Sequence, residues 1–257
     1  MIQSIIKEEQ NSVTSIDTCD VATRDLNILL REAVANGAQK IKLSNVCGQR
    51  YIGTDINRKV DIEIFGTPGN DLGAFMNGPR IIVHGNAQDG CGNTINEGEI
   101  IVHGHAADIT GLSALGGNIF IRDSVGYRAG IHMKEYQDRK PLIVIGGTAQ
   151  DFLGEYMAGG MIILLGLDLK EGENHRANYI GTGMHGGVIY LRGSVKDYQL
   201  GKEVGVSEIN DEDYLSLEKS VKDFAELFAY DSMEILKRRF IKLFPLYLRP
   251  YGRLYAY

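Results

Sequence analysis

The sequence predicts a mainly β protein: a single-stranded, right-handed parallel β-helix of about seven coils, with an N-terminal α/β cap and a C-terminal helical tail. Three observations favour this fold: an aliphatic phrase that recurs about every 20 residues, glycines that recur in phase with it, and helical patterns confined to the two ends of the chain. Glycine is also abundant, with 32 in 257 residues, against a usual level of roughly 7%.

The aliphatic phrase is a pentad that usually ends in glycine. Its first and third residues are aliphatic in every copy, and alternate side chains of a strand share one face. The copies are Ile62–Gly66, Ile81–Gly85, Ile100–Gly104, Ile119–Asp123, Leu142–Gly146, Ile162–Gly166 and Ile189–Gly193. Such a repeat suits one coil of a β-helix, in which like residues stack about 4.8 Å apart. In the fifth copy, for example, Leu142 and Val144 are expected to face inward and Ile143 outward.

The glycines form a second register, in which one glycine is followed by four residues and often by another glycine. The third residue after the first glycine is apolar in each copy. This column contains Met76, Ile95, Ala114, Met133, Met157 and Met184. We expect these glycines at coil corners, where a positive φ or a close approach between coils excludes a Cβ. Two polar insertions, 134–141 and 168–178, are expected to form surface loops.

The N-terminal part has helical spacing of apolar residues between Val21 and Gly37, with Thr23 as the expected N-cap and Gly37 as the expected C-cap. The strand Ile41–Leu43 follows and is expected to form the first coil. We therefore place the helix as a cap over the open end of the β-helix, which would otherwise expose the core.

The repeat stops after Gly205. An acidic helix start at Asp211 precedes an apolar stripe, and a second helix is expected from Ser232 to Leu243. The aromatic tail, 244–257, is expected to wrap a neighbouring surface of this chain or of a partner. The predicted parts are 1–55 (cap and first coil), 56–205 (β-helix) and 206–257 (C-terminal helices and tail).

The second residue of each pentad, between the two inward-facing positions, should point away from the core, and it is apolar in all copies except the first, where it is Glu63. An apolar stripe on an outer face predicts a covered surface. The cover is either the C-terminal segment of the chain or another protein chain, and both alternatives remain open. The candidate interface residues are Ile82, Ile101, Phe120, Ile143, Ile163 and Tyr190.

Charge and composition argue against several classes. A net charge of −6 disfavours nucleic acid or an anionic membrane as a partner. No apolar run approaches the ~20 residues of a membrane span, and the N-terminus has no signal-peptide pattern, so we expect a cytoplasmic protein. Three scattered cysteines, Cys19, Cys47 and Cys91, argue against a disulfide framework or a metal motif. They are expected to be buried thiols, with Cys91 in a turn of the repeat.

Three histidines are a candidate metal site. His84 and His103 occupy the same pentad position in adjacent coils, and His105 lies two residues further on. Three imidazoles brought together in this way have the ligand chemistry of a zinc site. The alternative is a stacked ladder on the surface.

Aspartates form another recurrent column, with Asp89, Asp108 and Asp197 four residues beyond a closing glycine and Asp151 near the same place. Paired carboxylates on a β-helix are typical of polysaccharide-cleaving enzymes. Asx turns at the corners explain the same spacing without chemistry, and we favour them. The stretch Gly181–Gly186 matches a dinucleotide fingerprint, but a strand follows it instead of a helix, so this interpretation is excluded.

The stretches Gly48–Gly53, Gly66–Gly78 and Gly154–Gly160 resemble the C-terminal GXGXG β-helix domain of the glutamate synthase large (α) subunit, in a free-standing form. The resemblance extends from about Ile41 to Gly205. A similar domain occurs in one of the chains of formylmethanofuran dehydrogenase.

The resemblance implies a structural role. In glutamate synthases an amidotransferase domain releases ammonia from glutamine, and an FMN and iron–sulfur barrel uses it to convert 2-oxoglutarate to glutamate, while the β-helix joins the two. It implies amidotransferase and FMN-binding glutamate synthase subunits as partners. FMN and the iron–sulfur cluster are expected on the FMN-binding partner. A homo-oligomer is also open. It implies no catalytic, cofactor-binding or metal residue in this chain. The alternatives are a formylmethanofuran dehydrogenase C-like subunit and an autonomous β-helix enzyme that acts on a polysaccharide.

Overall fold

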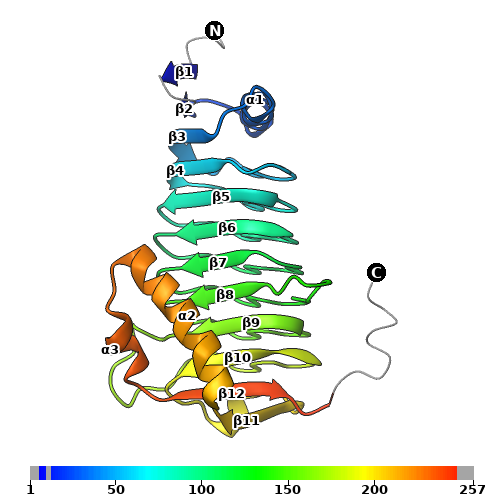
Figure 1. The fold of residues 1–257 in the computed structure, drawn as a ribbon, viewed down its shortest axis with the longest axis vertical. Helices are drawn as coiled ribbons and strands as arrows, with labels where there is room; N and C mark the ends of the chain where they lie inside the picture. The colour runs from blue at the N-terminus through cyan, green and yellow to red at the C-terminus, as the bar shows by residue number, and fades with distance from the viewer. Residues whose placement is uncertain (1–5, 10–12, 248–257) are drawn as a thin grey trace.

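The computed structural model describes residues 6–9 and 13–247, with side chains from residue 13 onward. The protein is a rod in which each coil contributes one strand to a continuous sheet (Figure 1). β3 (Lys40–Cys47) begins the parallel stack. The strands that follow are β4 (Asp61–Thr67), β5 (Asn77–His84), β6 (Glu97–Val102), β7 (Asn118–Ile121), β8 (Leu142–Ile145), β9 (Ala158–Leu164) and β10 (Gly186–Arg192). The predicted parallel β-helix is confirmed. The stack from β4 to β10 makes about six turns, slightly fewer than the seven coils predicted. The difference arises because seven successive strands have six turns between them.

Pairing between coils follows the repeat. Ile62 pairs with Ile81, Ile81 with Ile100 and Ile100 with Ile119, so that like side chains stack in columns. The inward residues of these strands are at most 1% exposed. Because each buried aliphatic side chain contributes about 1.5–3 kcal/mol, these columns are the main source of stability.

The prediction for the fifth pentad was wrong by one residue. Ile119 pairs with Ile143, and Phe120 pairs with Val144. Ile143 therefore lies in the inner core and Val144 on the outer face, while Leu142 is only partly buried. The run Leu142–Ile145 is aliphatic throughout, and two glycines follow it. After the insertion 134–141, neither the aliphatic alternation nor the closing glycine therefore shows which of these residues face the core.

The glycine register forms one corner of every coil. Gly53, 73, 92, 111, 130, 154 and 181 have φ between +66° and +76°. The apolar column that follows them, from Met76 to Met184, is at most 1% exposed, which confirms its expected place in the core. In most of these glycines a Cβ would collide with an isoleucine Cδ1 of a neighbouring coil, for example 2.5 Å from Ile162 at Gly130. The corner therefore needs glycine for both conformation and space.

The N-terminal end is closed by α1 (Thr23–Ala35) and by β1 (Ile6–Glu9), which pairs antiparallel with β2 (Val13–Asp17). Leu26, Leu29 and Leu30 of α1 join the same core as the coils, so the helix caps the open end as expected. Ala22 is the N-cap, and Thr23 is already helical. Gly37 follows the C-cap with φ +91°, because only glycine adopts this conformation without strain.

The C-terminal part reverses the chain. β11 (Val204–Glu208) precedes α2 (Asp211–Phe228) and α3 (Ser232–Leu236), and a turn, η2 (Asp197–Gln199), lies before them. The helix predicted from Ser232 to Leu243 was wrong, because β12 (Phe240–Pro245) follows α3 and runs antiparallel between β10 and β11. Ile241 and Leu243 of this strand join the inner core, and Phe240 joins the apolar cluster on the other face.

Within the described ranges, none of the helices combines the length and the apolar character that a bilayer span needs. Residues 248–257, most of the predicted aromatic tail, lie outside the described residues.

Candidate functional site

The outer apolar stripe is covered by the chain itself. α2 crosses the outer face of the lower coils (Figure 1), and its Leu217, Val221 and Phe224 form one buried cluster with the stripe. The stripe residues in this cluster are Ile101, Phe120, Val144, Ile163 and Tyr190. Two alternatives were predicted for what covers the apolar stripe, and the structure shows the C-terminal segment of the chain in that place. Ile82, further up the same face, is only partly buried, and Ile143 does not belong to this surface.

The N-terminal end of α2 is fixed by a small polar cluster. The Tyr190 hydroxyl donates to Asp213 Oδ1 at 2.6 Å, and Lys242 Nζ donates to the same oxygen at 2.6 Å. Asp213 also forms a capping box with Asn210. Burial opposes ionisation of Asp213, but the hydrogen bonds from Lys242 and Tyr190 outweigh it and lower its pKa. Burial, followed by Asp213, raises the pKa of Tyr190. The sequence analysis missed Asp213 and Lys242, although the Asn-x-x-Asp spacing carried the signal for the cap.

The histidines form a ladder and do not gather around a metal. The ring of His84 stacks on Phe65 at 4.5 Å and on His103 at 5.3 Å between centroids, and Phe228 of α2 meets His103 edge-on at 5.1 Å. His105 turns away, since its Nδ1 accepts from the Ser124 N–H at 3.2 Å. In residues 6–9 and 13–247, no three His, Cys, Asp or Glu residues are arranged to hold a metal ion.

The contact between His103 and Phe228 makes stability depend on pH. Burial, followed by the charges of His84 and Arg122, lowers the pKa of His103 below 6.5. Below this value the unfolded chain binds more protons than the folded chain, so this stabilisation is complete above pH 6.5 and declines as the pH falls. Burial also lowers the pKa of His175, so this residue makes stability decline with falling pH in the same way.

We therefore expect the urea midpoint of unfolding to decrease between about pH 7.5 and about pH 5.5. His103→Phe keeps an aromatic ring in the ladder and removes the titrating group, so its midpoint should decrease less over the same range. The wild-type protein in the same buffers is the reference. An unchanged pH dependence in His103→Phe would exclude His103 as the cause.

The aspartate column ties neighbouring coils together. Asp89 Oδ1 accepts from the Asp108 N–H at 3.1 Å, and Asp108 Oδ1 accepts from the Tyr127 N–H at 2.9 Å. Asp151 Oδ1 likewise accepts from the Asn178 N–H at 2.8 Å. These bonds join successive coils, whereas an Asx turn would bond within one coil. Asp197 does not share this position, because it begins η2.

The cysteines differ from their expected burial. Cys91 is fully buried, and burial raises its pKa to about 12. Cys19 and Cys47 are exposed. The expectation of three buried thiols was therefore wrong for these two, since Cys47 ends β3 and Cys19 lies just after β2, where the chain leaves the core.

A ridge of exposed aromatic side chains follows the glycine corner. The residues two before and two after each central glycine also have positive φ, and their side chains point outward in most coils. We call Tyr51, Phe75, Phe152, Tyr156 and Tyr179 the corner ridge. Phe152 stacks on Tyr179 at 4.9 Å, and Tyr156 stacks on His132 at 5.3 Å.

The glycines of the motif make room for the corner ridge. A Cβ on Gly183 would lie 2.5 Å from the Tyr156 ring. The sequence analysis did not identify this ridge, although the fixed offset of these residues from the central glycine marked it.

At each glycine corner, every second residue has a left-handed backbone conformation. Tyr179, Gly181 and Gly183, for example, have φ of +58°, +68° and +71°. This alternation explains why glycine recurs at every second position of the sequence motif. The family model for the GXGXG motif matches residues 23–248. The chain belongs to the GXGXG family. This family includes the C-terminal domain of the glutamate synthase α subunit, so the predicted resemblance is confirmed. This GXGXG chain is also similar to an uncharacterized protein of Methanocaldococcus jannaschii, with 46% identity over 249 residues that cover 94% of the chain and 95% of the relative.

Proposed function

We propose that the protein is a non-catalytic structural subunit of a glutamate synthase-type complex, in which it links and spaces an amidotransferase chain and an FMN-binding synthase chain. The corner ridge is the observation that carries this proposal. Its five aromatic side chains flank the central glycines of four coils, and four of them, Tyr51, Phe75, Tyr156 and Tyr179, are 46–52% exposed. Exposed tyrosine and phenylalanine side chains are typical of protein–protein contacts.

The rod suits a spacer because its length and surface are rigidly defined. Six turns at about 4.8 Å each span roughly 29 Å, and hydrogen bonds join successive coils at the glycine corner, such as Gly130 N to Thr110 O at 2.8 Å. Stacking of Phe152 on Tyr179 orients the ridge before a partner arrives. A preorganised surface loses little side-chain entropy on association.

In this proposal, FMN and the iron–sulfur cluster reside on the partner chain. The cysteines of the GXGXG chain do not fit a cluster site, because Cys91 is buried in the core while Cys19 and Cys47 are exposed. The aspartates of the polysaccharide alternative already accept hydrogen bonds from backbone N–H groups of neighbouring coils.

The test is reconstitution with the amidotransferase and FMN-binding chains from the same genome. We expect the three chains to co-elute in size-exclusion chromatography and glutamine-dependent glutamate formation to require this chain. The double variant Tyr156→Ala/Tyr179→Ala should weaken association at least about tenfold. Tyr214→Ala, which removes a 40% exposed tyrosine from α2, is the matched control and should have no effect.

Failure of the three chains to associate at roughly 50 µM, where a micromolar complex is nearly saturated, would overturn the proposal. Association with a molybdopterin-containing chain in their place would instead support the formylmethanofuran dehydrogenase alternative.

A further inference from the structure

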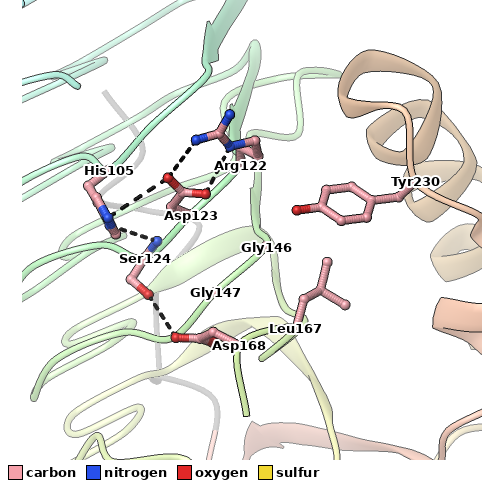
Figure 2. A pocket seen from close by; sticks show the side chains of 9 residues that line it. All are labelled: His105, Arg122, Asp123, Ser124, Gly146, Gly147, Leu167, Asp168 and Tyr230. Carbon is pink, nitrogen blue, oxygen red and sulfur yellow. Dashed lines mark hydrogen bonds and ion pairs between the residues drawn. The ribbon is translucent and has the colours of Figure 1, made fainter. Parts of the chain in front are cut away.

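A pocket of about 300 Å³ that carries several polar side chains lies beside the C-terminal end of α2, apart from the corner ridge. Four successive coils supply its walls where they leave β6 to β9, and Tyr230, just after α2, closes one side (Figure 2). Gly146 and Gly147 line the pocket with backbone alone, and a Cβ on either would collide with the preceding coil. A volume near that of ten water molecules holds a small metabolite and bridging water.

Tyr230 is held in place by the end of α2. Ala229, the C-cap, adopts a left-handed conformation with φ +57° and turns the chain back toward the coils. The Tyr230 ring then stacks on Phe224 at 5.8 Å between centroids. Figure 2 shows its hydroxyl directed toward the space in front of Asp123 and Gly146. In the part of the chain that the structure describes, this hydroxyl has no hydrogen-bond partner, so it is available to a ligand.

The upper wall of the pocket carries two further donors. Arg122 uses Nε and Nη2 for Asp123, at 2.9 Å each, which leaves Nη1 without a partner among the described residues. His105 Nδ1 accepts from the Ser124 N–H, so the neutral ring carries its proton on Nε2. That nitrogen lies 3.8 Å from Asp123 Oδ2, too far for a hydrogen bond.

The lower wall carries an acceptor. Asp168 lines the pocket, and its carboxylate receives one long hydrogen bond, from Ser124 Oγ at 3.4 Å (Figure 2). Leu167 lies beside it and provides an apolar contact. Two carboxylates disfavour a simple anion, and the Arg122 guanidinium disfavours a simple cation. A ligand with one charge of each sign, a few ångströms apart, matches both walls.

We propose that this pocket binds a small zwitterion of the free α-amino acid class. The ligand carboxylate accepts hydrogen bonds from Arg122, His105 and Tyr230. Its ammonium group donates to the carboxylate of Asp168, and a small side chain contacts Leu167. This site does not depend on the proposed role in a complex, because all of its groups belong to this chain.

The experiment is isothermal titration of the purified chain with glycine, L-alanine and L-serine, compared with sodium acetate and methylammonium chloride as the two halves of the ligand. At least one amino acid should bind with a dissociation constant at or below the millimolar range, and each half should bind at least about tenfold more weakly. Binding no tighter than that of the halves, or no binding at roughly 50 mM, would overturn the proposal.

Two variants assign the binding to this pocket. Asp168→Asn should weaken binding at least about tenfold, and Tyr230→Phe, which loses one hydroxyl donor, at least about threefold. Asp223→Asn and Tyr214→Phe change exposed residues of α2 and should bind like the wild type. Thermal midpoints show that each variant is folded. Unchanged affinity in both pocket variants would show that the amino acid binds elsewhere.

Discussion

Replacing Gly66 with alanine should destabilise the protein by about 3 kcal/mol or more. Gly66 has φ +128°, and a Cβ there would lie 2.1 Å from the carbonyl oxygen of Val46 in the preceding coil. Val46 and Gly66 are paired between β3 and β4, so the backbone cannot relieve the clash without separating the coils. Urea denaturation monitored by circular dichroism measures the loss.

The matched control is Gly193→Ala, at the same position of another pentad. Gly193 has φ +105°, but a Cβ there would meet no atom within 4 Å. It should cost only the conformational strain of about 1–3 kcal/mol. Equal losses at the two positions would mean that strain alone requires glycine and that close approach between coils does not.

Phe224→Ala should destabilise the protein by about 3–5 kcal/mol. Phe224 of α2 is fully buried between the helix and the sheet, and its ring lies against Phe228 at 4.8 Å between centroids. Its tip also fills the space above Gly146, where a Cβ would lie 2.7 Å from Phe224 Cζ. Truncation therefore leaves a cavity between α2 and the sheet.

Leu215→Ala on the exposed side of the same helix is the control, because Leu215 is 67% exposed. It should change stability by less than about 0.5 kcal/mol. Thermal unfolding of both variants in the isolated chain decides the matter. If Phe224→Ala unfolds like the wild type, α2 contributes little to the fold, and the stripe beneath it would be free for a partner.

The interior of the rod was readable from sequence because its signals repeat. The columns of Ile81 and Ile100 recur with identical spacing, and each copy reinforces the others, so both the parallel winding and the inward faces could be predicted. The glycine corner was predictable for the same reason. Where the repeat was interrupted, at 134–141, the phase was lost and Ile143 was placed on the wrong face.

The outer surface was less readable because it depends on contacts distant in sequence. The apolar stripe with Phe120 predicted a cover, but nothing in the pentads distinguishes α2 from a second protein chain. β12 was predicted as helix because a short run such as Phe240–Phe244 fits both periods. The pocket at Tyr230 combines residues from four coils with a residue that follows α2, so no local spacing marks it.

The antiparallel pairing of β12 with β10 has a consequence for assembly. A stack of identical parallel coils offers an edge on which a further coil, from this chain or another copy, can add without limit. Here β12 covers that edge of β10 in the opposite direction, and β11, which pairs with β12 and ends the sheet, lacks the left-handed glycine of the corner, so an incoming coil finds no like coil to continue. The two closing strands, β12 and β11, therefore end the stack of like coils and protect that end of the rod against fibre growth.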